Sequence, residues 1–279
     1  MKTLLLTPTL DKLSTLNTEL WFYLFVNEEF NANMTKFSER AKSLNTTDLF
    51  YKNKYSSRVD MMVKILPKFQ SSNRIATTGS YFSMCYEILS LYVEELIKAI
   101  KRYNNITYRL SPACGSEENL QRCLLRGGIA PVDNNIINTI KYFRLLRNSI
   151  IHLLNTPSNT LTSLINSESL NLKTYWQLQS PNNTLEFNKS DFSMYSIDEI
   201  FEMIKLMRVC IQKIDSHIGV NINQNNIIRD VLIKYPLKLN SLSRARKITK
   251  IQNHIWNWIS LRLTEQEAIM FIKCIFAIY

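Results

Sequence analysis

The residues in this sequence best suited to chemistry are an arginine, an asparagine and a histidine in the stretch RNSIIH, residues 147–152. His152 is one of only three histidines in the chain, and the run around it is otherwise apolar enough for a buried helix. Histidine can accept or donate a proton near neutral pH, and arginine can hold two phosphate oxygens through parallel N–H donors. Arg147 and His152 therefore suit acid–base chemistry at a phosphate ester, and Asn148 could orient the histidine ring or bind the backbone of a substrate.

A single helix is expected to carry this motif. The sequence predicts that the helix opens at Pro131 and Asp133 and ends before Pro157, so the motif lies at its C-terminal end. A helix with this apolar pattern should be largely inside the protein, and its polar side chains therefore need partners. The apolar residues at helical spacing are Phe143, Leu146, Ile150, Leu153 and Leu154.

The polar residues of this helix share one narrow stripe. At about 100° per residue, Arg144, Asn148 and His152 lie within a turn or so of one another, and Asn155 extends the stripe. Arg147 lies beside the stripe, about 140° from His152 around the helix. We therefore expect that the Arg147 side chain bends across the helix, or that the pair converges with a second copy from another chain. Arg144 is expected to add a phosphate contact.

The composition predicts an all-α protein with an anionic partner. The chain has 279 residues, of which 46% are hydrophobic and 20% charged, and its 5 Gly and 7 Pro leave little material for tight turns. Its net charge of +11 favours a polyanion, most often nucleic acid. The alternative is a soluble surface that happens to be rich in lysine.

Three regions are expected along the chain: an N-terminal helical region at 1–74, a helical bundle at 75–219 and a basic C-terminal helical region at 220–279. Pro67 and the stretch QSSN at 70–73 favour a boundary near 68–78. In the bundle, helices are expected over 80–103, over 116–127 and from the capping box SIDE at 196–199. The segments KTYWQLQ and TLEFN, separated by SPNN, suggest a small β-hairpin insertion near 172–190.

Several classes of protein are disfavoured by what the sequence lacks. The five cysteines, at positions 85, 114, 123, 210 and 274, have no zinc-type spacing and are odd in number, so reduced core residues are expected. There is no glycine-rich phosphate loop or serine-nucleophile motif, so we expect neither a metal nor a cofactor. We find no signal peptide and no apolar run near the roughly 18 residues of a membrane span. A cytoplasmic protein without membrane contact is therefore expected.

Much of the positive charge lies in residues 220–263, which hold four Lys and four Arg against one acidic residue, for a net charge of +7. An exposed tryptophan can stack on an unpaired base, but the spacing of Ile251, Ile255, Trp258 and Leu261 favours a buried stripe for the two tryptophans, at 256 and 258. The basic side chains stay available to neutralise RNA phosphates in either case. The residues expected to bind RNA here are Arg244, Arg246, Lys247 and Lys250.

The order of Arg147, a polar residue and a histidine after four intervening positions resembles the motif of the HEPN superfamily. Its members are small helical bundles, and many are metal-independent endoribonucleases of toxin–antitoxin, phage-abortive and CRISPR-associated defence. In that family the motif is an Arg, usually followed by Asn, Asp or His, with four to six residues before the closing His. The resemblance covers about residues 78–218 and leaves the subfamily open.

The resemblance implies a reaction and a set of partners. The substrate would be RNA, cleaved by its own 2′-oxygen to leave 2′,3′-cyclic phosphate and 5′-hydroxyl ends, with Arg147 and His152 catalytic and Asn148 in support. It also implies a homodimer through the motif helix, which would unite two Arg and two His, and an antitoxin or regulatory partner. Some family members have a tyrosine two residues after the histidine as a site of AMP modification. Leu154 occupies that position here, which argues against this regulation.

Two other kinds of protein fit the same residues. One is a helical bundle that binds RNA or DNA without cutting it. The other is a helical scaffold whose polar stripe packs as a seam against the helix at 196–217, with His152 a structural residue favoured by the helix dipole. Loss of cleavage in a His152→Ala variant would separate the nuclease from the binding module. Binding that is indifferent to salt would favour the scaffold.

Overall fold

The chain folds entirely from helices, which confirms the predicted all-α class. The computed structural model describes residues 1–152, 156–239 and 241–278, and within them an isolated bridge between Asn45 and Met62 is the only β-type pairing. Twelve α-helices and two short 3-10 helices, η1 and η2, account for the regular structure of these residues. In the same described ranges, no helix is both long and apolar enough to cross a membrane.

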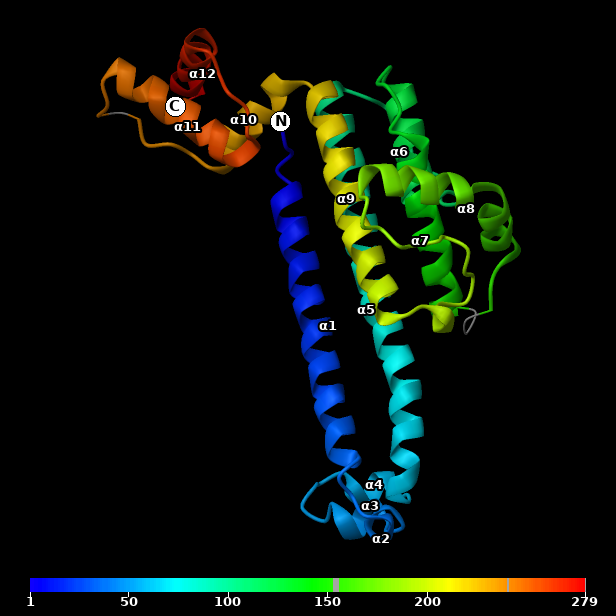
Figure 1. Cartoon of the computed structure of the whole chain (residues 1–279). Helices are drawn as coiled ribbons and strands as arrows, with labels where there is room; N and C mark the ends of the chain where they lie inside the picture. The colour runs from blue at the N-terminus through cyan, green and yellow to red at the C-terminus, as the bar shows by residue number, and fades with distance from the viewer. Residues whose placement is uncertain (153–155, 240, 279) are drawn as a thin grey trace.

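The bundle is built around α5 (Leu66–Asn104), a helix of 39 residues and therefore about 58 Å in length. It packs against α1 (Leu6–Met34), α6 (Ser116–Arg126), α7 (Asn134–His152) and α9 (Ile197–Asn221) (Figure 1). Apolar residues of α5 recur at helical spacing through Leu89, Val93, Leu96 and Ile100, and all four are fully buried. The central helix thus supplies one face of the core and fixes the positions of the helices around it.

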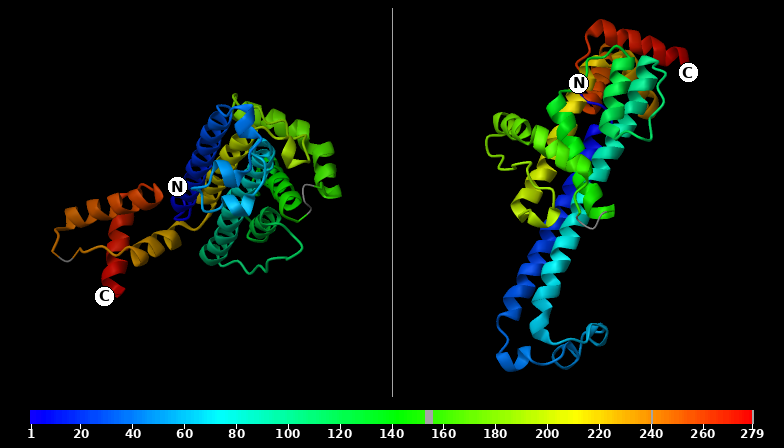
Figure 2. Two further views of the ribbon diagram at one scale, coloured as in Figure 1. Left: turned by 90° about the horizontal axis from the view of Figure 1, so that it is seen from below. Right: turned by 90° about the vertical axis from the view of Figure 1, so that its right-hand side faces the viewer.

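The long helices α1 and α5 extend beyond the bundle as an antiparallel arm (Figures 1 and 2). Four short helices close its far end: α2 (Glu39–Lys42), α3 (Thr46–Leu49), α4 (Ser56–Val59) and η1 (Val63–Ile65). The boundary expected near 68–78 falls inside α5, so the first region and the bundle share one continuous helix. Pro67 is tolerated because it lies in the first turn, where its missing N–H leaves no helical hydrogen bond unmade.

The small β-hairpin expected near 172–190 is wrong. Residues 172–179 are the last two turns of α8 (Asn159–Gln179), and 180–191 form an irregular loop. Leu172 and Trp176, four residues apart, are both buried on one face of α8, and Trp176 Nε1 donates to Thr139 Oγ1 of α7 at 2.7 Å. The helical period of these apolar residues outweighed the β-type composition of the segment.

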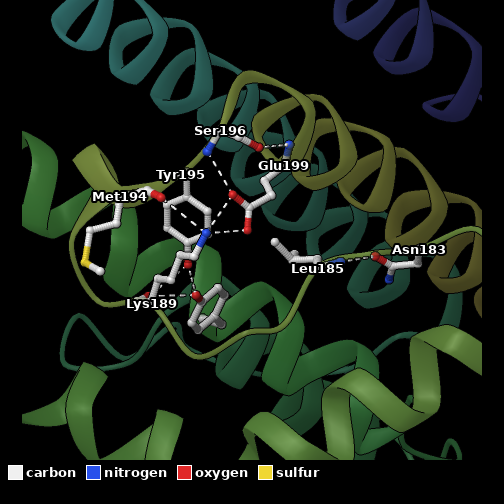
Figure 3. Close-up of polar contacts among 8 residues, drawn as sticks. Asn183, Leu185, Lys189, Met194, Tyr195, Ser196 and Glu199 are labelled. Carbon is white, nitrogen blue, oxygen red and sulfur yellow. Dashed lines mark hydrogen bonds and ion pairs between the residues drawn. The ribbon is translucent and has the colours of Figure 1, made fainter.

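Polar contacts join the loop after α8 to the start of α9, as Figure 3 shows. Lys189 Nζ donates to both carboxylate oxygens of Glu199, at 2.6 and 2.7 Å. Ser196 and Glu199 form the predicted capping box, and a turn of 3-10 helix, η2 (Phe192–Met194), precedes it. This loop covers the side of the bundle formed by α7 and α9.

Three further helices, α10 (Gln224–Lys234), α11 (Arg244–Ile259) and α12 (Glu265–Ile278), follow the bundle and lie beside the N-terminal end of α1 (Figure 1). Lys2 N donates to Ile259 O at 2.9 Å, which joins the first residues to the end of α11. Thr3 donates to the buried Asp215 of α9 through its backbone N–H, at 2.9 Å, and its hydroxyl, at 2.5 Å. Tyr92 of α5 donates to the same carboxylate at 2.9 Å, so Asp215 connects three segments distant in sequence.

Candidate functional site

Arg147 and His152 lie together at the C-terminal end of α7. Arg147 Nη1 is 3.3 Å from His152 Nε2, within hydrogen-bond distance, although the residues are about 140° apart around the helix. The arginine side chain therefore bends across the helix, the first of the two arrangements that the sequence allowed. His152 is exposed to solvent, so a ligand can reach its ring.

Asn148 belongs to the same cluster. Its Oδ1 accepts a hydrogen bond from Arg147 Nη1 at 3.1 Å, so this nitrogen lies against both Asn148 and His152. Asn148 thereby contacts the guanidinium, whereas the sequence suggested that it would orient the histidine ring or bind the backbone of a substrate. Asn155, which was expected to extend the stripe, lies outside the described residues.

Glu87 of α5 completes the cluster and was missed by the sequence analysis. Its Oε1 forms an ion pair with Arg147 Nη2, whereas the contact with His152 is made by Nη1. The Glu87 side chain is 47% exposed and that of Arg147 22% exposed, so the pair lies at the surface of the α5–α7 interface. Glu87 lies off the apolar stripe of the helix predicted at 80–103, and only the packing of α5 on α7 shows that it faces the motif.

The Nε of Arg147 is buried and has no hydrogen-bond partner among the described residues. A buried N–H without an acceptor is costly, and an anionic oxygen is the acceptor that an arginine binds most strongly. The guanidinium is therefore held in place by Glu87 and Asn148 with one donor still unsatisfied. Because Nε is buried, a phosphate that approaches His152 would have to bind the terminal nitrogens of Arg147, where it competes with Glu87.

Arg144, which was expected to contact phosphate, is directed at α6 instead. Its Nε donates to Glu117 Oε1 at 2.9 Å, and its Nη2 lies 3.6 Å from Glu118 Oε1. The Glu117 side chain is fully buried, and burial raises the pKa of its carboxyl, a rise that the charge of Arg144 partly offsets. These contacts give Arg144 a structural role, and a phosphate contact from it stays a prediction.

Each cation of α7 that faces a neighbouring helix thus forms an ion pair with a carboxylate. Lys141 Nζ lies 3.0 Å from Glu118 Oε1, Arg144 binds Glu117, and Arg147 binds Glu87. These carboxylates belong to α5 and α6. The scaffold alternative had instead placed the polar stripe of this helix against the helix at 196–217, which is part of α9. Of the three cations, only Arg147 also contacts an exposed histidine.

The basic residues of the C-terminal region lie on α11, at the opposite end of the bundle from the C-terminal end of α7 (Figure 1). Arg244, Arg246 and Lys250 are exposed, and Lys247 is half-buried. Lys250 Nζ also donates to the backbone oxygen of Lys238 at 3.1 Å. The structure therefore brings Arg147, Asn148 and His152 together but places this basic group elsewhere.

The expected burial of the two tryptophans on α11 is wrong. Trp256 is 44% exposed and Trp258 37% exposed, while Ile251, Ile255 and Ile259 are completely buried. The last buried position of α11 is Ile259 and not its neighbour Trp258. Trp258 therefore lies at the edge of the buried face of the helix. There Trp258 stacks on Tyr235 with ring centroids 3.5 Å apart.

No group of three or more His, Cys, Asp or Glu side chains in the described part of the chain is arranged to hold a metal ion. Four cysteines, Cys85, Cys114, Cys123 and Cys210, are free thiols, and all but Cys114 are buried. No family model, curated protein or solved structure matches this chain. The chemistry of the motif is therefore argued from the geometry of its side chains.

Proposed function

We propose that this chain is a metal-independent endoribonuclease of the HEPN type, with Arg147 and His152 catalytic and Asn148 in support. The observation that carries the proposal is the 3.3 Å contact between Arg147 and the exposed ring of His152 at the end of a bundle helix. A nearby cation and a titratable ring are what transfer of a proton at a phosphate ester requires.

In the proposed reaction the 2′-oxygen of the RNA attacks the adjacent phosphorus while the bond from phosphorus to the 5′-oxygen breaks. A histidine accepts the proton of the 2′-hydroxyl, and a protonated histidine donates one to the leaving 5′-oxygen. Arg147 stabilises the charge that develops on the phosphate oxygens. Each chain offers one His152, so a homodimer through the motif helix would provide the base and the acid together.

The ion pair with Glu87 has a consequence for this proposal. A phosphate must replace or displace the Glu87 carboxylate to bind Arg147 Nη2, because two anions cannot share that donor closely without repulsion. Activity would then depend on RNA that binds tightly enough, through other contacts, to open this pair. A role in toxin or antiphage defence, a neutralising partner and a cytoplasmic location follow from the HEPN resemblance and are part of the proposal.

The direct test is incubation of the purified protein with total and transfer RNA in EDTA, followed by analysis of the product ends. Arg147→Ala and His152→Ala should abolish cleavage, and the wild type should leave cyclic phosphate and 5′-hydroxyl ends. His217→Ala and Arg126→Ala are matched controls, since both residues lie on other helices, His217 half-buried and Arg126 exposed. Equal cleavage by all five proteins would reject the assigned site.

A second candidate is a helical module that binds RNA or DNA without cutting it. Two observations favour it: Glu87 neutralises Arg147, and a separate group of exposed basic residues lies on α11. This candidate predicts binding that weakens as salt rises and that the His152→Ala variant retains, with intact RNA ends throughout. A scaffold would show binding that does not depend on salt.

A further inference from the structure

We propose that the tip of the arm, residues 36–68, is a binding surface for single-stranded RNA, with bases stacked on Tyr51 and Tyr55. The choice of RNA as the polymer rests on the proposed function, but the surface itself is separate from the motif. Tyr51 is 71% exposed and Tyr55 56% exposed, which makes them unusual among tyrosines, whose rings are commonly at least partly buried. Exposed aromatic rings are platforms on which unpaired bases stack.

Each of the two rings has an ammonium group over one face, which leaves the other face for a base. Lys52 Nζ lies 5.8 Å from the centroid of the Tyr51 ring, and Lys54 Nζ lies 4.8 Å from that of Tyr55. Both lysines are exposed. A base stacked on such a ring would have its phosphate within reach of the neighbouring ammonium, so the stretch YKNKY offers stacking and charge neutralisation together.

The charge of the whole tip has the sign that this ligand requires. Residues 36–68 contain eight Lys or Arg and three acidic residues, a net charge of +5 out of +11 for the chain. Arg58, Lys64 and Lys68 are exposed as well, so the charge is available to solvent. A surface that is both basic and aromatic fits a nucleic acid, whereas an acidic peptide would leave the exposed rings without a specific role.

The tip is a folded cap and holds its tyrosines in defined places. Thr46 N donates to Met61 O at 2.9 Å and Val63 N donates to Leu44 O at 2.9 Å, which closes the segment that carries the rings. Val63 is completely buried, and Tyr55 N donates to Asn53 Oδ1 at 2.9 Å between the two tyrosines. Pre-formed rings cost less conformational entropy on binding than rings on a disordered loop.

The tip is joined to the motif by α5 itself. Lys68 and Glu87 are 19 residues apart on this helix, a separation of about 28 Å along its axis. Glu87 contacts Arg147, so an RNA held at the tip could run along the arm toward His152. The tip would then supply the additional affinity with which the RNA displaces Glu87 from Arg147.

The test measures binding separately from cleavage, in the full chain carrying His152→Ala so that RNA stays intact. A fluorescent, unstructured RNA of about 20 nucleotides, longer than most single-strand binding sites, is titrated while its anisotropy is followed. The variants are Tyr51→Ala with Tyr55→Ala, and Lys52→Gln with Lys54→Gln. Tyr51→Phe with Tyr55→Phe retains the rings, and Lys12→Gln with Lys205→Gln removes the same charge from exposed sites on α1 and α9.

We expect the alanine pair to weaken binding at least about fivefold for each base deprived of its stacking platform, and the phenylalanine pair to bind as tightly as the parent. The glutamine pair at 52 and 54 should make the slope of log K against log salt shallower by about 1.4, or about 0.7 for each phosphate that is no longer neutralised. A duplex of the same sequence should bind the alanine pair almost as tightly as the parent. Circular dichroism melts check that every variant folds.

Affinities that are equal across the tip variants and the controls would overturn the proposal, as would binding to anionic lipid vesicles without binding to RNA. Failure of the proposed function gives a different result. A chain with native His152 that binds RNA through the tip but leaves it intact would reject the nuclease and support the tip. If the tip variants cleave RNA at the wild-type rate and with the same dependence on RNA concentration, the nuclease is supported and the tip is rejected as an RNA-binding surface.

Discussion

Arg147 forms an ion pair with Glu87 through Nη2 and contacts His152 through its other terminal nitrogen, Nη1. The same side chain is thus shared between a carboxylate of α5 and the histidine at the end of its own helix. In the proposed reaction the carboxylate would compete with a phosphate for the arginine, so Glu87 would restrain the site as well as position Arg147.

Replacement of Glu87 with Gln should therefore increase the affinity for RNA. Loss of the carboxylate removes its repulsion of a phosphate at Arg147, and we expect affinity to rise by about tenfold at low salt, with a smaller gain at high salt. The measurement is RNA binding at several salt concentrations. Glu95→Gln is the control, since Glu95 is an exposed residue of α5 that pairs with Lys98. Weaker binding by Glu87→Gln would show that the carboxylate only positions the arginine.

Arg147→Lys should retain most RNA binding but lower the rate of cleavage by about 10²–10³-fold. A lysine keeps the positive charge, but it cannot donate from two planar nitrogens to Asn148 and to phosphate oxygens at once. Single-turnover cleavage with saturating enzyme separates this rate from affinity. Arg126→Lys on α6 is the matched control, and a wild-type rate in Arg147→Lys would mean that charge alone is sufficient.

Glu117→Ala should destabilise the fold by about 3 kcal/mol, because it leaves Arg144 partly buried without its closest carboxylate. The neighbouring Glu118→Ala should cost less than about 1 kcal/mol, since Glu118 is partly exposed. Urea unfolding measures both. If Arg144 is structural, the folded fraction of Glu117→Ala should still cleave RNA. If Glu117→Ala and Glu118→Ala lowered the free energy of unfolding equally, burial of Glu117 would not strengthen its ion pair with Arg144.

Asp215 should make stability depend on pH. Burial raises the pKa of this carboxyl above its ordinary value of 3.8, although hydrogen bonds from Thr3 and Tyr92 oppose the rise. Because the folded state then binds the proton more tightly than the unfolded state, stability from this group is greatest below 3.8 and is lost as pH rises through the folded pKa.

Asp215→Asn removes that titration. The melting temperature of the variant relative to the wild type should therefore increase as pH rises from about 3.8 through the raised pKa of Asp215, and level off above it. Thermal melts between pH 3 and pH 8 give the difference directly. Asp11→Asn, at an exposed site on α1, is the control variant. A constant difference between Asp215→Asn and the wild type would indicate that the pKa of Asp215 is the same folded and unfolded.

The sequence was most informative where local patterns decide the structure. The burial of Phe143 and Leu146, the capping box of Ser196 and Glu199, and the position of the motif at the end of α7 were all predicted and are confirmed. Ile150 is half-buried, and Leu153 and Leu154 lie outside the described residues. Each confirmed feature depends on residues within a few turns of one another, which physical rules for helices describe well. The same rules could not foresee Glu87, because its contact with Arg147 exists only after α5 packs on α7.

The polar residues and the proline that suggested a boundary near 68–78 lie within the continuous helix α5, where α1 lies alongside. The incorrect prediction of a hairpin has a similar origin. The supposed hairpin rested on the composition of 172–190, although the four-residue spacing of Leu172 and Trp176 already had the period of a helix. The exposed tyrosines of the tip lie in a segment whose short helices depend on contacts between residues as distant as Leu44 and Val63.

The continuity of α5 has a consequence for the size of substrate that this chain would select. One unbroken helix separates Lys68 from Glu87 by about 28 Å, so the arm would act as a molecular ruler for an RNA that binds both the tip and the motif. An RNA too short to span that length could occupy one end or the other but not both. Insertion of a helical turn in α5, matched by one in the antiparallel α1, would lengthen the ruler by about 5.4 Å and raise the minimum length of RNA accordingly.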